Sequence, residues 1–197
     1  MNRRDQTAPR VGTLARLPAG VRGDARFSPD RRYRYWLERR WDASLPRFTY
    51  ILLNPSTAGH DHDDKTNQRL RAITVANGGG GYELVNLFAV VDTYQVSLHR
   101  PAAVEETPGA NDEWVTRAAA RAEVVVLGWG DGTGVGTDAA ARRTEVKRRA
   151  GDVWPLVRDY NPQCFTVNVS GAPGHPLYLN TTSPMTDYVP SPGYLTA

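Results

Sequence analysis

Short apolar runs recur along the chain at the spacing of a layered α/β protein. Residues 47–53, 81–90 and 123–130 are almost continuously apolar, as expected for strands covered on both faces of a sheet. A fourth apolar run covers residues 164–170. Residues 31–41 instead alternate arginines with aromatic and apolar residues, which predicts a strand whose aromatic side chains share one face. Together these runs predict the strands of one sheet.

Polar segments with helical features separate these runs. A helix is predicted from near Thr66 to the glycines at 78–81, because glycine commonly closes a helix. A second helix is predicted over 111–122, with Asn111 as its N-cap, and a third over the Ala/Arg-rich residues 138–150. Strands that alternate with helices favour a three-layer α/β sandwich with a mainly parallel central sheet, here preceded by an N-terminal β-hairpin.

The charge of the chain is divided unequally between its two parts. The first 50 residues hold 12 arginines against 5 acidic residues, whereas the remainder holds 12 basic against 16 acidic residues. Residues 1–28 show no apolar period, so we predict a basic flexible arm followed by one domain over 29–197. A basic arm on a mildly acidic body is typical of contact with nucleic-acid phosphates, although such arms also serve solubility.

The composition argues against several other classes of protein. The chain has 197 residues, 40% of them hydrophobic and 23% charged, which suits one globular domain. It has no apolar stretch of the roughly 18–20 residues that a membrane helix needs, and no secretory signal is apparent. The lone Cys164 cannot form an internal disulfide or a four-cysteine metal site, so the cytoplasm is the expected location. No motif implies a cofactor or an obligate protein partner.

Polar, turn-prone residues follow the apolar runs where the strands are predicted to end. Residues 54–57 follow the first run, Asn86 lies near the end of the second, and residues 128–132 end the third. Residues 174–178 follow the last run after a short loop. Ligands of open parallel sheets bind beyond the carboxyl ends of the strands, so we expect these segments to converge on one cleft. Taken singly, each has a structural alternative, such as a turn cap at Asn54.

Residues 60–64, with the sequence HDHDD, hold two histidines and three aspartates. Such side chains are able to bind a divalent metal, but the segment is short and follows Gly59, which is typical of a solvated loop. Asp64 also stands at the start of the predicted helix, where the helix dipole favours a carboxylate. We therefore predict no metal site.

The order of these motifs resembles that of the uracil-DNA glycosylase superfamily, in particular its mismatch-specific branch. LLNPSTAGH is similar to the superfamily's first motif, ELVNLFAV to the strand whose asparagine reads the base, and HPLYLN to its late loop. The similarity spans roughly residues 47–180. More closely, the chain resembles an uncharacterised bacterial and phage family of domains of unknown function, whose members share Y-R-Y-x-L-x-R-x-W, L-N-P-S-T-A, N-L-F-A and H-P-L-Y.

The resemblance implies a site that breaks the N-glycosidic bond of a flipped base in DNA. In that site Asn54 would hold the attacking water, and His175 would donate a hydrogen bond to the departing base. An amide cannot take up a proton, so Asp64 would supply the missing carboxylate. The resemblance implies no metal and no other cofactor.

The same resemblance assigns contacts to the base and to DNA phosphates. Asn86 has the donor and the acceptor that reading a base edge demands, while Phe88 or Tyr82 would stack on the base. Leu177 and Tyr178 replace the serine and proline that hold a DNA phosphate in the superfamily, which predicts an altered grip and a base other than uracil. The residues assigned to DNA phosphates are Ser56, Thr57, Gly174, Tyr178, Arg3 and Arg4.

The sequence therefore predicts a DNA glycosylase-like hydrolase that acts on a modified or damaged base in DNA. Two alternatives stay open. One is a non-catalytic module that binds DNA or a base with the same pocket, and the other is an N-glycosidase that acts on free nucleosides or nucleotides. The prediction depends on one geometric condition, that the Asn-Pro turn at 54–55 and the His-Pro loop at 175–176 face a common cleft.

Overall fold

A seven-stranded mixed sheet forms the centre of the molecule. The computed structural model describes residues 14–92, 95, 98, 109–133 and 138–195. The strand order is β2-β3-β6-β4-β7-β8-β9, and β1 pairs with β5 in a separate two-stranded ribbon. The strands are β1 (Ala15–Arg16), β2 (Arg22–Phe27), β3 (Arg34–Arg40), β4 (Arg47–Leu52), β5 (His62–Asp63), β6 (Gly81–Asn86), β7 (Val124–Leu127), β8 (Gln163–Cys164) and β9 (Thr186–Asp187).

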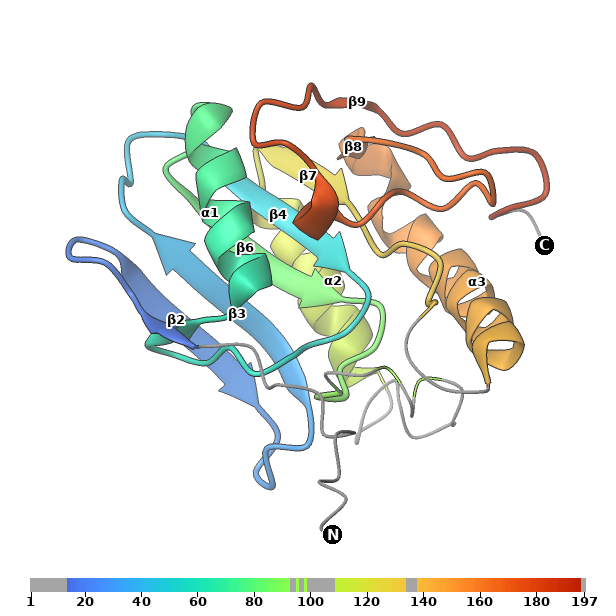
Figure 1. The fold of residues 1–197 in the computed structure, drawn as a ribbon, viewed down its shortest axis with the longest axis horizontal. Coiled ribbons are helices and arrows are strands. Elements are labelled where there is room, and N and C mark those ends of the chain that lie inside the picture. Colours follow the sequence, from blue (N-terminus) through green and yellow to red (C-terminus); the bar gives the residue numbers. More distant parts are fainter. Residues whose placement is uncertain (1–13, 93–94, 96–97, 99–108, 134–137, 196–197) are drawn as a thin grey trace, which may run out of the picture.

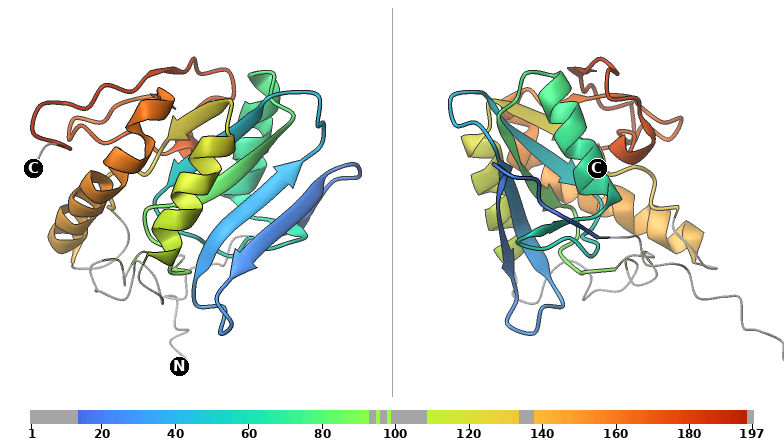
Figure 2. Two further views of the ribbon diagram at one scale, coloured as in Figure 1. Left: turned by 180° about the vertical axis from the view of Figure 1, so that it is seen from behind. Right: turned by 60° about the vertical axis from the view of Figure 1, so that its left-hand side comes forward.

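Helices cover both faces of this sheet (Figures 1 and 2). Helix α1 (Lys65–Ala76) lies on one face, while α2 (Ala110–Arg121) and α3 (Ala139–Val157) lie on the other. Two clusters of buried apolar side chains fill the layers between helices and sheet. The predicted α/β class and the three predicted helices are thus confirmed. Within the described ranges, none of the helices has the length and apolar character needed to span a membrane.

The sheet is mixed rather than mainly parallel, which corrects the expectation from the sequence. The pairs β6–β4, β4–β7 and β7–β8 are parallel. The pairs β2–β3, β3–β6 and β8–β9 are antiparallel, which makes three of the six strand pairs in this described sheet. Antiparallel strands need only a short connection, and the N-terminal hairpin extends the sheet in this way without a crossover helix.

The N-terminal hairpin includes residues that we expected in the flexible arm. Strand β2 pairs with β3 over its whole length, from Arg22 opposite Arg40 to Phe27 opposite Arg34. This strand lies at the edge of the sheet and exposes charged side chains, so it lacks the apolar period that marks a buried strand. The expected arm is therefore wrong for residues 22–27, while residues 1–13 lie outside the described part of the chain.

A register shift in the hairpin divides the residues that were predicted to share one face of its second strand between two clusters. The shift lies between Arg26 and Phe27. Leu37 packs in the cluster beneath α1, whereas Tyr33 and Tyr35 belong to a separate small cluster. An inserted residue turns the following side chains to the other face of a strand, so the single aromatic face predicted from strict alternation is wrong.

The start of α2 also differs from the prediction. Gly109 caps this helix in the left-handed backbone region, at φ 87°, in place of Asn111. Asn111 is instead fully buried, and its side-chain amide donates to the backbone carbonyls of Asn86 and Leu87 at 3.0 and 3.1 Å. The asparagine thus ties α2 to the end of β6.

The fourth apolar run contributes only Gln163–Cys164 to the sheet. Beyond Thr166 the chain reverses in a tight turn, in which the Gly171 amide donates to the Asn168 carbonyl and the Asn168 amide to the Ala172 carbonyl. Gly171 has φ 92°, a conformation that glycine adopts without a steric penalty. The run therefore forms a short strand and a loop rather than one long strand.

Candidate functional site

A cavity of about 820 Å³ opens at the carboxyl ends of β4 and β7. Its walls are the loops that follow these two strands, the first residues of α1, and the loop that leads into the 3-10 turn η3 (Pro176–Tyr178), which packs beside α1 (Figure 1). Asn54 and His175 both line it, so the Asn-Pro turn and the His-Pro loop face a common cleft as predicted. The volume is typical of small-molecule sites, which span about 300–1,000 Å³.

The side chain of Asn54 keeps an unpaired acceptor beside the cavity. Its amide nitrogen donates to the backbone carbonyls of Pro55 and Asp92, at 3.0 and 2.5 Å. Both amide protons are thus engaged, while no described residue donates to its Oδ1 atom. An amide oxygen held in this way is able to orient a water molecule but cannot remove a proton from it.

Asp64 caps α1 and brings a carboxylate to the cavity. Its Oδ1 atom accepts from the backbone N–H and the side-chain amide of Asn67, at 2.8 and 2.9 Å. The residue is only 8% exposed and lines the cavity. Because the N-terminus of a helix stabilises negative charge, this position favours a carboxylate. The Oδ1 atom of Asp64 therefore serves the helix, and the negative charge of the carboxylate acts on the buried Arg34 and on His175.

His175 is a neutral hydrogen-bond donor in this cavity. Desolvation lowers the pKa of its imidazole to about 4, although the negative charge of Asp64 acts in the opposite direction. Nδ1 accepts a hydrogen bond from the backbone N–H of Leu177 at 3.3 Å, so the neutral ring carries its proton on Nε2. At neutral pH the Nε2–H group is therefore a donor without positive charge.

Three of the residues assigned to DNA phosphates line the cavity, namely Ser56, Thr57 and Gly174. The Gly174 amide donates to the carbonyl of Thr166 at 2.8 Å, so it has no proton left for a phosphate, and this part of the prediction is corrected. A side chain does not fit at Gly174 either, because an added Cβ would lie 2.1 Å from the Thr166 hydroxyl oxygen. Gly174 is therefore needed for the close approach of two loops.

The other predicted phosphate contacts cannot be compared with the structure. Arg3 and Arg4 precede the described residues, and the side chain of Tyr178 is also outside the described part. Their assignment stays a prediction.

The three residues expected to bind the base do not line the cavity. Tyr82 and Asn86 are each 1% exposed, and Phe88 is fully buried. The Tyr82 hydroxyl donates to the side chain of Asn67 at 2.9 Å, and its ring packs edge-on against Tyr50. Phe88 and Tyr82 belong to the two core clusters. In this arrangement none of the three is able to contact a base in the cavity.

Several cavity residues were not indicated as site residues by the sequence. They are Lys65, Asp92, Gln95, Thr166 and Asn168. Asp131 accepts from the Asn168 amide at 2.7 Å and also from the Ser170 hydroxyl, so it holds the turn at 168–171 against the loop after β7. The Gly-rich segment after β7 was a signal for Asp131. Thr166 and Asn168 gave none, because they lie within an apolar run.

The side chains of the HDHDD segment (residues 60–64) contact different partners rather than one common centre. Its two histidines contact neighbouring aspartates, Asp63 forms a buried ion pair with Arg39 at 2.8 Å, and Asp64 caps α1. No group of three or more potential metal-binding side chains occurs among the residues that the structure describes. The segment therefore shapes the wall of the cavity through hydrogen bonds.

Arg39 fixes this segment from beneath. Besides its pair with Asp63, its guanidinium donates to the backbone carbonyls of Gly59, His60 and His62, at 2.6, 3.4 and 3.0 Å. The side chain of Arg39 has no exposed surface. The buried Arg39 guanidinium thus holds together the segment that leads directly to Asp64.

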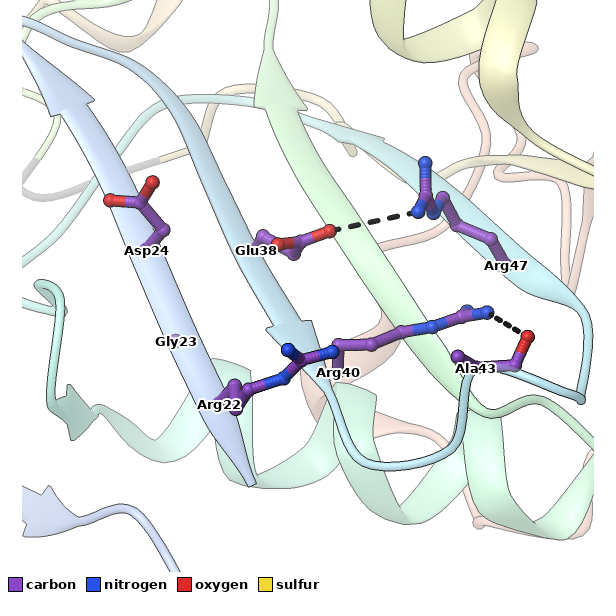
Figure 3. Close-up of a pocket in the computed structure, with 7 residues that line it drawn as sticks. All are labelled: Arg22, Gly23, Asp24, Glu38, Arg40, Ala43 and Arg47. Atoms are coloured by element: carbon purple, nitrogen blue, oxygen red, sulfur yellow. Dashed lines mark hydrogen bonds and ion pairs between the residues drawn. The ribbon is translucent and has the colours of Figure 1, made fainter. Parts of the chain in front are cut away.

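A second depression, of about 580 Å³, lies at the opposite edge of the sheet (Figure 3). It borders Arg40, which lies opposite Gly81, the first residue of β6. Figure 3 shows Arg47 directed towards Glu38 and Arg40 directed towards the carbonyl of Ala43, at 3.9 and 3.0 Å. Asp24, Glu38 and Arg47 form ion pairs within the fold, while Arg40 donates only to backbone carbonyls.

Comparison with known families covers most of this structure. Residues 34–177 match the model of a family described as "Protein of unknown function (DUF1643)". The matched range contains Asn54, Asp64 and His175. Neither the curated proteins nor the solved structures give a match.

Proposed function

The chain belongs to this family, and because the family's description assigns no activity, we propose a function from the cavity itself: hydrolysis of the N-glycosidic bond of a nucleobase in DNA. The observation that carries the proposal is the meeting of three complementary groups in one cavity. They are the Asp64 carboxylate, the unpaired Asn54 oxygen and the uncharged donor on His175.

The chemistry of the reaction matches these three groups. Water adds to the anomeric carbon as the carbon–nitrogen bond breaks, so the sugar gains a hydroxyl and the base leaves with the bonding electrons. Asn54 orients the water, and Asp64 accepts its proton, which is then available to the departed base. His175 stabilises the negative charge of the leaving base by donating from Nε2.

The charge of the lining indicates which part of a nucleotide the cavity accepts. Its acidic residues are Asp64, Asp92 and Asp131, and its only basic side chain among the described residues is Lys65, with His175 neutral. Such a lining repels phosphate groups but hydrogen-bonds readily to a base and to sugar hydroxyls. The base and sugar therefore enter while the phosphates stay outside. The same observation favours a second candidate, hydrolysis of free nucleosides, for which no phosphate has to be held.

The decisive experiment is a test for released base. The protein is incubated with free nucleosides and with oligonucleotides that carry natural, deaminated or hypermodified bases, and the products are identified by mass spectrometry. We expect release of one class of base and formation of alkali-sensitive sites in the oligonucleotide. If no substrate loses a base at high protein concentration, hydrolysis is ruled out in favour of a non-catalytic base-binding module.

A pair of variants ties any activity to the cavity. Asn54→Ala removes the oxygen that orients water, so we expect release to fall about a hundredfold, within the usual range for positioned catalytic groups. Asn180→Ala makes the same change at an exposed asparagine outside the lining and should leave release unchanged. Equal activity of the two variants would contradict the assigned role of Asn54.

A further inference from the structure

The turn that joins β2 to β3 carries two exposed arginines, Arg31 and Arg32. In Figure 1 this turn projects beyond the helices and strands that surround the sheet. The side chain of Arg32 is 66% exposed. Exposed guanidinium groups on a projecting turn are accessible to a large partner without any change in the fold.

Both guanidinium groups are held against aromatic rings. The Arg31 guanidinium lies 4.1 Å from the ring centre of Phe27, and the Arg32 guanidinium lies 5.6 Å from that of Tyr33. Stacking on a ring restrains a long side chain while leaving the N–H groups at its rim free to donate. Arginines restrained in this way lose less conformational entropy when they bind an anion.

The acidic residue of the turn is used to shape the backbone. Asp30 accepts hydrogen bonds from the Ser28 hydroxyl at 2.7 Å and from the Arg32 amide at 3.0 Å. Its second oxygen is 3.8 Å from Arg32, an exposed pair of the kind that contributes little. The turn therefore keeps a net positive charge at its surface.

The backbone at Arg31 indicates that its side chain is not there to form the turn. Arg31 has φ 60°, the left-handed region that favours glycine, and its amide closes the turn on the Ser28 carbonyl at 2.9 Å. Glycine or asparagine would occupy this position with less strain. An arginine in a strained position is consistent with a role for the guanidinium itself.

The turn is connected directly to the rim of the cavity. The Arg32 carbonyl accepts from the Val91 amide at 2.9 Å, and Tyr33 forms a β-bridge with Val90. The next residue, Asp92, lines the cavity and its carbonyl holds Asn54. The turn that carries the two arginines is therefore paired with a segment that reaches the cavity on this side.

We propose that this turn, through Arg31 and Arg32, binds the phosphate backbone of a nucleic acid whose base occupies the cavity. The part that places a base in the cavity rests on the proposed function. The phosphate contact favours a nucleic acid over the free nucleosides of the second candidate. The turn supplies the positive charge that the acidic cavity lacks, so base and backbone are held by different parts of the molecule.

The test measures binding of fluorescently labelled single-stranded and duplex 20-mers by anisotropy at increasing salt. The variant Arg31→Gly with Arg32→Gln removes both guanidinium groups, and glycine suits the left-handed position, so the hairpin should keep its fold and melting temperature. We expect affinity to fall at least tenfold at low salt. The slope of log affinity against log salt should also decrease by about 1–2, as expected for two lost phosphate contacts.

A matched control removes two exposed charges elsewhere. Arg143→Gln with Lys147→Gln changes two exposed residues of α3 and should leave affinity and salt slope close to those of the unmodified protein. The proposal is overturned if both double variants lose affinity equally, if the turn variant binds normally, or if the unmodified protein binds neither 20-mer.

The same measurement separates this proposal from the proposed function. Binding that depends on the turn, without release of any base, would support the phosphate contact and reject the hydrolysis. Release from free nucleosides by a protein that binds no 20-mer would reject the phosphate contact and support the cavity chemistry.

Discussion

The two edges of the sheet carry depressions of opposite character. At the carboxyl edge of the parallel strands, the cavity contains three groups whose hydrogen-bonding capacity is only partly used by the fold: Asn54, Asp64 and His175. At the other edge, the buried Glu83 accepts hydrogen bonds from two arginines at distances of 2.9 to 3.5 Å, next to a depression that also holds several charges.

The difference shows that volume and charge alone do not identify a site. Charged groups that satisfy one another stabilise the fold, whereas polar groups left unpaired beside a cavity are available to a ligand. We therefore expect substitutions at the two edges to have opposite effects. Changes at the cavity should remove activity at little cost in stability, and changes at the opposite edge should do the reverse.

The largest effect is expected at Asp64. Asp64→Asn removes the carboxylate that accepts a proton, so base release should fall by about 10²–10⁴-fold. Asparagine caps helices as well as aspartate does, so the free energy of unfolding should change by less than about 1 kcal/mol. Base release is measured by mass spectrometry and stability by urea denaturation. Undiminished release would show that the carboxylate takes no part in the chemistry.

At the opposite edge, Glu83→Ala should act on stability. The substitution leaves Arg47 and Arg121 without their shared buried partner, so we expect the free energy of unfolding to fall by about 2–3 kcal/mol. Base release below the unfolding transition should be unchanged. Glu113→Ala, which breaks an exposed pair with Arg117, is the control and should cost less than about 0.5 kcal/mol. Loss of base release in the Glu83 variant would contradict the expectation that this edge of the sheet affects stability but not activity.

Acid should weaken the cavity edge through His175. Its pKa is about 4 in the folded protein and near 6.5 in the unfolded chain, so the unfolded chain takes up the proton first as the pH falls. The stability that depends on neutral His175 is therefore present above pH 6.5 and declines towards pH 4, by about 3 kcal/mol.

Urea denaturation between pH 7 and pH 4 tests this dependence. His175→Gln should flatten the decline, while His60→Gln, at a histidine with half of its side chain exposed, should not. If the two variants show the same dependence on pH, His175 is not the titrating group.

The smallest effect is expected at Arg22, which lines the second depression and is exposed. Arg22→Gln should change the free energy of unfolding by less than about 0.5 kcal/mol, as is usual for exposed positions. It should also leave base release from nucleosides unaltered. A clear loss of base release in this variant would indicate that the second depression takes part in function. The assignment of function to the cavity edge alone would then be wrong.

The sequence predicted the buried elements better than the exposed ones. Strands β4, β6 and β7 carry continuous apolar runs because both of their faces are covered, and they were recognised on that basis. Strand β2 is equally regular but lies at the edge with charged side chains, so it gave no signal. The antiparallel pairing of β3 with β6 was also hidden, because strand direction depends on the connections and not on side-chain pattern.

For the site as well, the sequence indicated positions along the chain but not the direction in which each side chain points. Asn54, Asp64 and His175, which all line the cavity, were predicted because each lies at a strand end, a helix start or a Gly/Pro loop, positions that local sequence marks. Asn86 and Phe88 also lie at or just beyond a strand end, but whether such a side chain faces the cleft or the core is decided by packing against neighbouring elements. Sequence pattern alone does not contain that information.

The five hydrogen bonds of the Arg39 guanidinium make one wall of the cavity rigid. A shift of the segment before Asp64 would strip several hydrogen bonds from a guanidinium that water cannot reach, so this wall holds its place whatever occupies the cavity. Any adaptation to the width of a ligand must come from the loops on the side of the cavity that faces this wall. One wall of the cavity is thus rigid, and the size of ligand that fits is set by how far the loops on the other side of the cavity are able to move.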